Sequence, residues 1–110
     1  MNHLDQINKE REEAKEEIEL ADALDKLFKN RAYKKVFDEH VFKTLPANAG
    51  RYFNKAGLPE HVQKNLENTL TMVSALQDTL STIMVQGNAA HQKLQELDAE
   101  EVAYLEETEE

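Results

Sequence analysis

The sequence predicts an all-α protein, and three observations lead to this fold class. Its 110 residues include only 2 prolines and 3 glycines, too few turn residues for a fold of many strands. Charged residues make up 32% of the chain and hydrophobic residues 40%, so we expect solvated helix faces around a small core. Apolar residues also recur at helical spacing along most of the chain. We therefore expect a single helical domain over residues 1–110, an elongated helical hairpin or bundle that self-associates through one long helix.

The first predicted helix covers residues 4–29. Its apolar and small residues follow a three- and four-residue spacing that Arg11 interrupts. The first half has a narrow apolar stripe and many charged residues, whereas the second half, IELADALDKLF, is rich in apolar residues. We expect the second half to be buried and the first half to project or to pair with another chain. Asn30 is then a break, cap or bend before the next helix.

The second predicted helix covers residues 31–45. Pro46 disfavours helical geometry at Leu45, so we expect the helix to end there. Residues 46–58 should form an irregular connection, in which ANAGRYFNKAG has room for one irregular helical turn that Gly57 closes. Its apolar positions recur at helical spacing and form one face. They are Tyr33, Val36, Phe37, His40, Val41 and Leu45.

The longest predicted helix covers residues 59–97 and begins with Pro59, whose missing N–H is not needed in a first turn. Its spacing of apolar and small residues is a heptad pattern typical of a coiled coil or a bundle helix. The pattern runs through Val62, Leu66, Thr69, Val73, Leu76, Leu80, Ile83, Gly87, Ala90, Leu94 and Leu97. Such a helix would be roughly 58 Å long, too long for a compact globule of this size. We expect the oligomer seam at Leu66, Val73, Leu76, Leu80, Ile83, Gly87, Ala90 and Leu94.

The end of the chain is predicted to hold a separate short helix over residues 99–107. Asp98 and Glu101 have the spacing of a capping box, which marks a helix start. Val102 and Leu105 would then dock this helix on one face. The acidic tail EETEE has no partner in its own segment and should fray.

Gly87 lies on the heptad pattern, and a glycine inside a helix costs about 1 kcal/mol relative to alanine. Ala90, one turn later, is also small, whereas the preceding heptad positions are large. We therefore expect the helix to continue through Gly87 and another helix, from the same chain or another, to cross closely there. A kink at Gly87 is the alternative.

The net charge of −9 is unevenly distributed. Residues 1–25 carry nine acidic and three basic side chains, residues 26–64 carry three acidic and nine basic, and residues 65–110 carry ten acidic and one basic. The overall charge disfavours nucleic-acid binding as the main role. Complementary charge between the segments is expected to set the register and the partners of the helices.

The basic segment 26–64 leaves an alternative open. Its stretch KLFKNRAYKKVF interleaves basic and aromatic residues, which can grip phosphates and stack on bases. We favour a different interpretation, in which the aromatic rings point into the core and the cations meet acidic segments of the same or a neighbouring protomer. The cations of such a basic contact would be Lys29, Arg31, Lys34 and Lys35. A third interpretation is an acidic inhibitor that mimics DNA and binds a host protein.

No catalytic, cofactor or metal site is expected. The chain has no cysteine, which excludes disulfides and thiolate ligands. Its four histidines are too far apart to share a helix face, and none follows a glutamate at the di-iron spacing. Three scattered glycines cannot form a phosphate-binding loop, and Ser74 and Ser81 fall within the long helix rather than on a strained turn. We expect no enzymatic activity.

No targeting or membrane segment is expected. The first residues, MNHLDQINKEREEAKEE, are charged where a signal peptide is apolar. No run approaches the roughly 18 apolar residues of a membrane span. The chain is thus expected to be neither secreted through a signal peptide nor inserted in a membrane.

Two stretches, EIELADALDKLFKNRAYKKVFDEHVF and LQDTLSTIMVQGNAAHQKLQELDAEEVAYLEE, resemble small helical proteins encoded by tailed bacteriophages. In that group a Lys-Asn-Arg or Lys-Asn-Lys gap separates two helices, and Gln-Gly lies late in a long helix. Here these features are residues 29–31 and 86–87, whereas TLPANAGRYFNKAGLPEH departs from the group. The resemblance implies a virion structural or assembly protein whose partners are itself and other virion or assembly proteins. Its expected location is the virion or the host cytoplasm.

Overall fold

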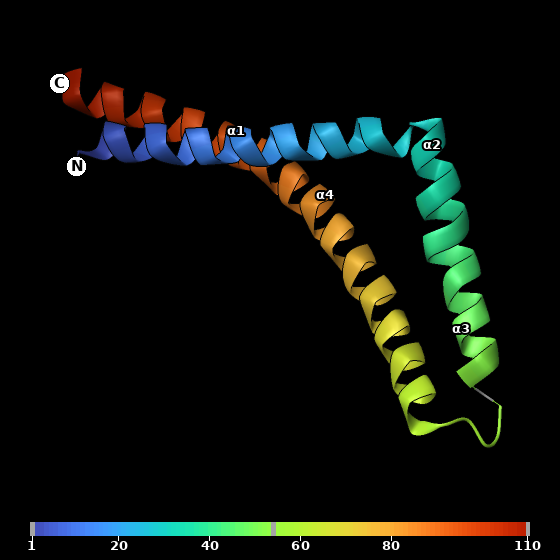
Figure 1. The fold of residues 1–110 in the computed structure, drawn as a ribbon. Helices are drawn as coiled ribbons and strands as arrows, with labels where there is room; N and C mark the ends of the chain where they lie inside the picture. The colour runs from blue at the N-terminus through green and yellow to red at the C-terminus, as the bar shows by residue number, and fades with distance from the viewer. Residues whose placement is uncertain (1, 54, 110) are drawn as a thin grey trace. The chain divides into compact units, whose positions relative to one another are not determined.

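A computed structural model describes residues 2–53 and 55–109 of the chain. These residues are helical almost throughout and contain no strand, which confirms the predicted all-α class (Figure 1). None of the helices among them combines the length and the hydropathy needed to cross a lipid bilayer. In chain order the elements are α1 (His3–Phe28), α2 (Arg31–Tyr33), the π-helix η1 (Lys34–Thr44), α3 (Leu45–Phe53) and α4 (Glu60–Glu109).

The contacts divide the chain into two compact units. Unit 1 comprises Met1–Asp25 and Thr82–Glu110, and unit 2 comprises Lys26–Ser81. In unit 1, α1 and the last part of α4 lie side by side and antiparallel, so that the start of α1 and the end of α4 lie at the same end of the helix pair (Figure 1). The buried positions of this pair are mostly small, which favours a close approach of the two helices. They are Ile7, Ala14, Ala21, Leu24, Gly87, Ala90 and Leu97.

Asparagine side chains cap the first two α-helices. The Oδ1 of Asn2 accepts a hydrogen bond from the Asp5 backbone N–H at 2.8 Å, at the start of α1. After α1 ends at Phe28, the Oδ1 of Asn30 accepts one from the Tyr33 N–H at 3.0 Å. The predicted break at Asn30 is therefore an N-cap for the helical run that follows.

That helical run does not end at Pro46, contrary to the sequence prediction. It passes from η1 directly into α3, so residues 46–53 are helical where an irregular connection was expected. The Leu45 N–H donates to the His40 carbonyl, the wide i→i+5 bond of a π-helix. Because this turn is wider than an α-helical one, the proline ring avoids the clash that it makes in a regular helix. Pro46 has no N–H to donate, so the continuous run lacks one backbone hydrogen bond at this residue.

The predicted end of the connection is confirmed at Gly57. Its φ of 80° lies in the left-handed region that glycine adopts readily. The chain turns here and enters α4. At the start of this helix the Pro59 carbonyl accepts a hydrogen bond from the Gln63 backbone N–H at 3.1 Å. Pro59 therefore precedes the helix, one residue from the predicted start.

The helix α4 continues without interruption to Glu109, so the predicted separate helix over residues 99–107 is wrong. Asp98 lies inside α4 and not at a helix start, and its carboxylate contacts Arg11 of α1. Val102 and Leu105, the residues expected to dock the short helix, are 55% and 42% exposed. They lie on the outer side of α4, away from the buried stripe.

Candidate protein-interaction surface

The helices of unit 1 approach each other closely at Gly87, as the sequence predicted. A Cβ atom at Gly87 would overlap the Cβ of Ala21 and lie 3.6 Å from the Glu17 carbonyl oxygen. The helix is continuous through this position, so Gly87 marks a close contact rather than the end of a helix. The neighbouring helix is α1 of the same chain.

A charged cluster joins the same two helices nearer the chain ends. The Arg11 guanidinium lies 3.0 Å from an Asp98 carboxylate oxygen and 2.5 Å from one of Glu101. The hydrogen bond with Glu101 raises the pKa of Arg11 above its ordinary value. A guanidinium stays charged at working pH even without such a shift. Asp98 and Glu101 present two carboxylates from consecutive turns of α4, which suits the planar guanidinium.

Arg11 occupies a position of the α1 stripe that faces α4, and not an interruption of it. The partly or fully buried residues of α1 continue on either side of it at three- and four-residue spacing, including Ile7 and Ala14. A single polar residue within an apolar seam restricts the alignment of two helices, because any shifted pairing leaves the charge without its partners. The observed antiparallel register is the one in which Arg11 meets both carboxylates.

A further contact lies at the end of the helix pair. The His3 Nε2 lies 3.1 Å from a Glu100 carboxylate oxygen, and the His3 ring is 5.0 Å from the ring of Tyr104. Both partners belong to the last turns of α4. This contact does not reach residues 106–110, the segment that was expected to fray, although α4 continues through Glu109.

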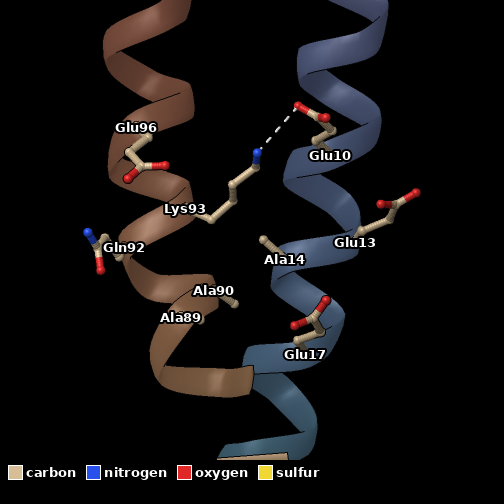
Figure 2. A pocket seen from close by; sticks show the side chains of 9 residues that line it. All are labelled: Glu10, Glu13, Ala14, Glu17, Ala89, Ala90, Gln92, Lys93 and Glu96. Atoms are coloured by element: carbon tan, nitrogen blue, oxygen red, sulfur yellow. Dashed lines mark ion pairs between the residues drawn. The ribbon is translucent and has the colours of Figure 1, made fainter. Parts of the chain in front are cut away.

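An open groove runs along unit 1 between the two helices (Figure 2). Ala14 and Ala90 point toward each other at its floor, and its rim is strongly acidic. Across it, Lys93 Nζ lies 3.9 Å from a Glu10 carboxylate oxygen. We call this surface the acidic groove; it is lined by Glu10, Glu13, Ala14, Glu17, Ala89, Ala90, Gln92, Lys93 and Glu96.

The predicted seam residues lie on the least exposed stripe of α4. The stripe keeps its three- and four-residue spacing from Val62 to Tyr104, beyond the predicted end at Leu97. Of the eight predicted seam residues, Val73, Gly87 and Ala90 are buried. The other five, Leu66, Leu76, Leu80, Ile83 and Leu94, are half-buried within a single chain.

The four predicted cations of the basic contact are exposed in unit 2. Lys29 follows α1, Arg31 lies in α2, and Lys34 and Lys35 open η1. Arg31, Lys34 and Lys35 are three and four residues apart and therefore share one side of the helical run. We call these three residues the basic face.

The aromatic residues near the basic face pack on one another. The Tyr33 ring stacks on Phe37 with centroids 4.8 Å apart, and it also meets Phe28 at 5.5 Å. Phe37 in turn lies 6.2 Å from Phe42. These rings form a cluster within unit 2 and are not free platforms for stacking on bases.

Tyr33 itself is buried, and its hydroxyl has no hydrogen-bond partner among the described residues. Burial raises the pKa of this hydroxyl, and the nearby Asp38 carboxylate raises it further. Because the folded state holds the neutral form, its contribution to stability is present below the ordinary pKa and is lost as the pH rises through the folded value.

We expect Tyr33→Phe to leave stability unchanged or to raise it by up to about 1 kcal/mol at neutral pH, because it removes an unpaired buried hydroxyl. The advantage should grow with alkaline pH. Thermal unfolding of both proteins, followed from neutral pH to beyond the ordinary tyrosine pKa, measures this difference. Tyr52→Phe is the control, since Tyr52 is exposed; an equal response of the two variants would contradict the expectation.

Among the described residues no group of three histidine or carboxylate side chains is arranged to hold a metal ion. Comparisons of the chain with protein-family models, with curated proteins and with solved structures found no match. The candidate site therefore depends on the geometry of this chain alone.

Sequence reasoning missed the cluster of Arg11, Asp98 and Glu101. A count of apolar positions alone makes Arg11 an interruption, although its spacing from its neighbours already matches the stripe. Asp98 and Glu101 were assigned to a local cap because a capping box and a three-residue ion-pair partner have the same sequence spacing. Arg11 and Glu101 carry opposite charges at stripe positions of α1 and α4. This is the sequence feature that could have indicated their pairing.

Proposed function

We propose that this chain is a non-enzymatic structural or assembly protein that acts through association of its helices. The stripe of α4 is the observation that supports this most. Its large residues stay half-buried in a single chain, at the spacing by which helices pack into bundles and coiled coils. Covering Leu66, Leu76 and Leu80 with another helix would remove apolar surface from water at about 25 cal/mol per Å².

The resemblance to small helical proteins of tailed bacteriophages suggests where such an assembly would act. It points to a virion component or an assembly factor, with other copies of the chain and other virion proteins as partners. Mass spectrometry of purified particles of the encoding virus, and of their assembly intermediates, tests this placement. Peptides of the chain at a fixed ratio to the major particle proteins are expected; their absence from both preparations would count against it.

The association itself is tested by placing charge on the stripe. Leu76→Asp/Leu80→Asp should convert the oligomer to smaller species in sedimentation velocity, because two carboxylates would have to be buried without partners. A loss of at least about 3 kcal/mol in association free energy is expected. Met72→Asp/Val85→Asp is the matched control, since both of its positions are exposed on the same helix. An unaltered Leu76→Asp/Leu80→Asp species would overturn the proposal.

A second candidate function follows from the charge of unit 1. This unit contains 17 acidic and 4 basic residues, a net charge of −13. Such a surface favours an acidic inhibitor that imitates a phosphate array and occupies a basic site on a host protein. A chain that stays monomeric alone and forms a one-to-one complex with a basic, DNA-binding host protein would support this function over assembly.

A further inference from the structure

We propose that the acidic groove of one copy receives the basic face of a second copy, so that chains associate head to tail. This inference rests on the proposed function and names the surfaces that would carry the association. Unit 1 has a net charge of −13, whereas unit 2, with 5 acidic and 9 basic residues, has a net charge of +4. Each copy thus offers one surface of each sign.

The acidic groove holds more negative charge than its own cation balances. Lys93 is the single cation on its rim, and it lies near Glu10. Glu13 and Glu17 form no ion pair in the part of the chain that the structure describes. Neighbouring carboxylates on one helix repel each other, and a cation from outside would relieve that repulsion.

The basic face matches this spacing. Arg31 and Lys35 are four residues apart, as are Glu13 and Glu17, so both pairs are separated by about 6 Å along a helix. Val36, which is 51% exposed beside Lys35, adds an apolar side chain to this surface.

A second copy fits the basic face better than a nucleic acid does. The aromatic rings next to the basic face are engaged in their own cluster and are not available for stacking on bases. The chain also carries a net charge of −9, which repels a polyanion. In such an assembly each copy binds one neighbour through its basic face and another through its acidic groove. Heterologous contacts of this kind propagate into rings or filaments.

Two charge-reversal variants test the proposal, each alone and then mixed. The groove variant is Glu13→Lys/Glu17→Lys, and the face variant is Arg31→Glu/Lys35→Glu. Alone, each brings like charges together at every contact and should raise the dissociation constant of self-association by about tenfold or more. An equimolar mixture restores opposite charges at both contacts, so association should return toward the wild-type value. Sedimentation velocity at low and high salt measures this, and salt should weaken the wild-type and mixed associations alike.

Matched controls carry the same change of net charge elsewhere. They are Glu106→Lys/Glu107→Lys and Lys43→Glu/Lys64→Glu, all at exposed positions. Both should associate as the wild type does, and circular dichroism should show unchanged helix content in all four variants.

The outcomes separate this inference from the proposed function. A wild type that is monomeric under all conditions overturns both. A wild type that associates, with charge-reversal variants that associate equally well or a mixture that does not recover, overturns only the pairing of these surfaces. Self-association that survives the face variant, together with loss of single-stranded DNA binding in a titration, would assign the basic face to nucleic acid instead.

Discussion

Replacing Leu97 with alanine is expected to lower the free energy of unfolding by about 2–5 kcal/mol. Leu97 is only 1% exposed, and together with Ile7 it is one of two large side chains that are fully buried among the described residues. Apart from Ile7 and Leu24, the other buried positions of unit 1 are small, so little side-chain volume is present to refill the space that the truncation leaves. A loss of this size is a large fraction of the stability of an ordinary domain.

Urea unfolding followed by far-ultraviolet circular dichroism measures this loss. Leu105→Ala is the matched control, because Leu105 lies on the same helix and is 42% exposed. Its effect should stay within about 0.5 kcal/mol. Equal losses for the two variants would mean that the last part of α4 does not pack on α1 along the observed face.

The second large effect is expected at Gly87. Alanine there gains about 1 kcal/mol of helix propensity, but its Cβ would overlap the Cβ of Ala21. Neither atom can move away by rotating a side chain, so the helices must separate, and overpacking of this kind costs about 1–3 kcal/mol. We expect Gly87→Ala to be destabilising by up to about 2 kcal/mol once the gain in helix propensity is subtracted from the cost of overpacking.

Two comparisons isolate the steric cause. Gly50 also lies within a helix, but a Cβ there would meet no atom within 4 Å; Gly50→Ala should therefore raise stability by about 0.4–1 kcal/mol. The double variant Gly87→Ala/Ala21→Gly removes the overlap and should recover much of the loss. If Gly87→Ala were as stabilising as Gly50→Ala, the close approach of the two helices would be wrong.

Much of this fold follows from local sequence pattern. The spacing of apolar residues predicted α1 and the stripe of α4, because one face of an amphipathic helix has to be covered. Gly87 could be identified as a close contact because it lies on that stripe near another small residue. A helical backbone does not require glycine, so the small size of the residue is the reason for its presence.

The errors arose where a local rule met a tertiary constraint. Pro46 ends an ideal α-helix, but the π-helical turn before it relieves the clash and the helix continues. Asp98 and Glu101 resemble a cap when α4 is considered alone, whereas Arg11 on another helix decides their role. Their pairing joins residues about ninety positions apart, and no spacing within one helix contains that information.

The central claim is that the chain works by associating with other helices, and sedimentation of the unmodified protein over a wide range of concentration tests it most directly. We predict a reversible shift from monomer to larger species as the concentration rises from low micromolar toward millimolar. High salt should weaken this shift without abolishing it, because the half-buried stripe of α4 contributes apolar association that salt does not screen. A single monomeric species at every concentration and salt would contradict the account.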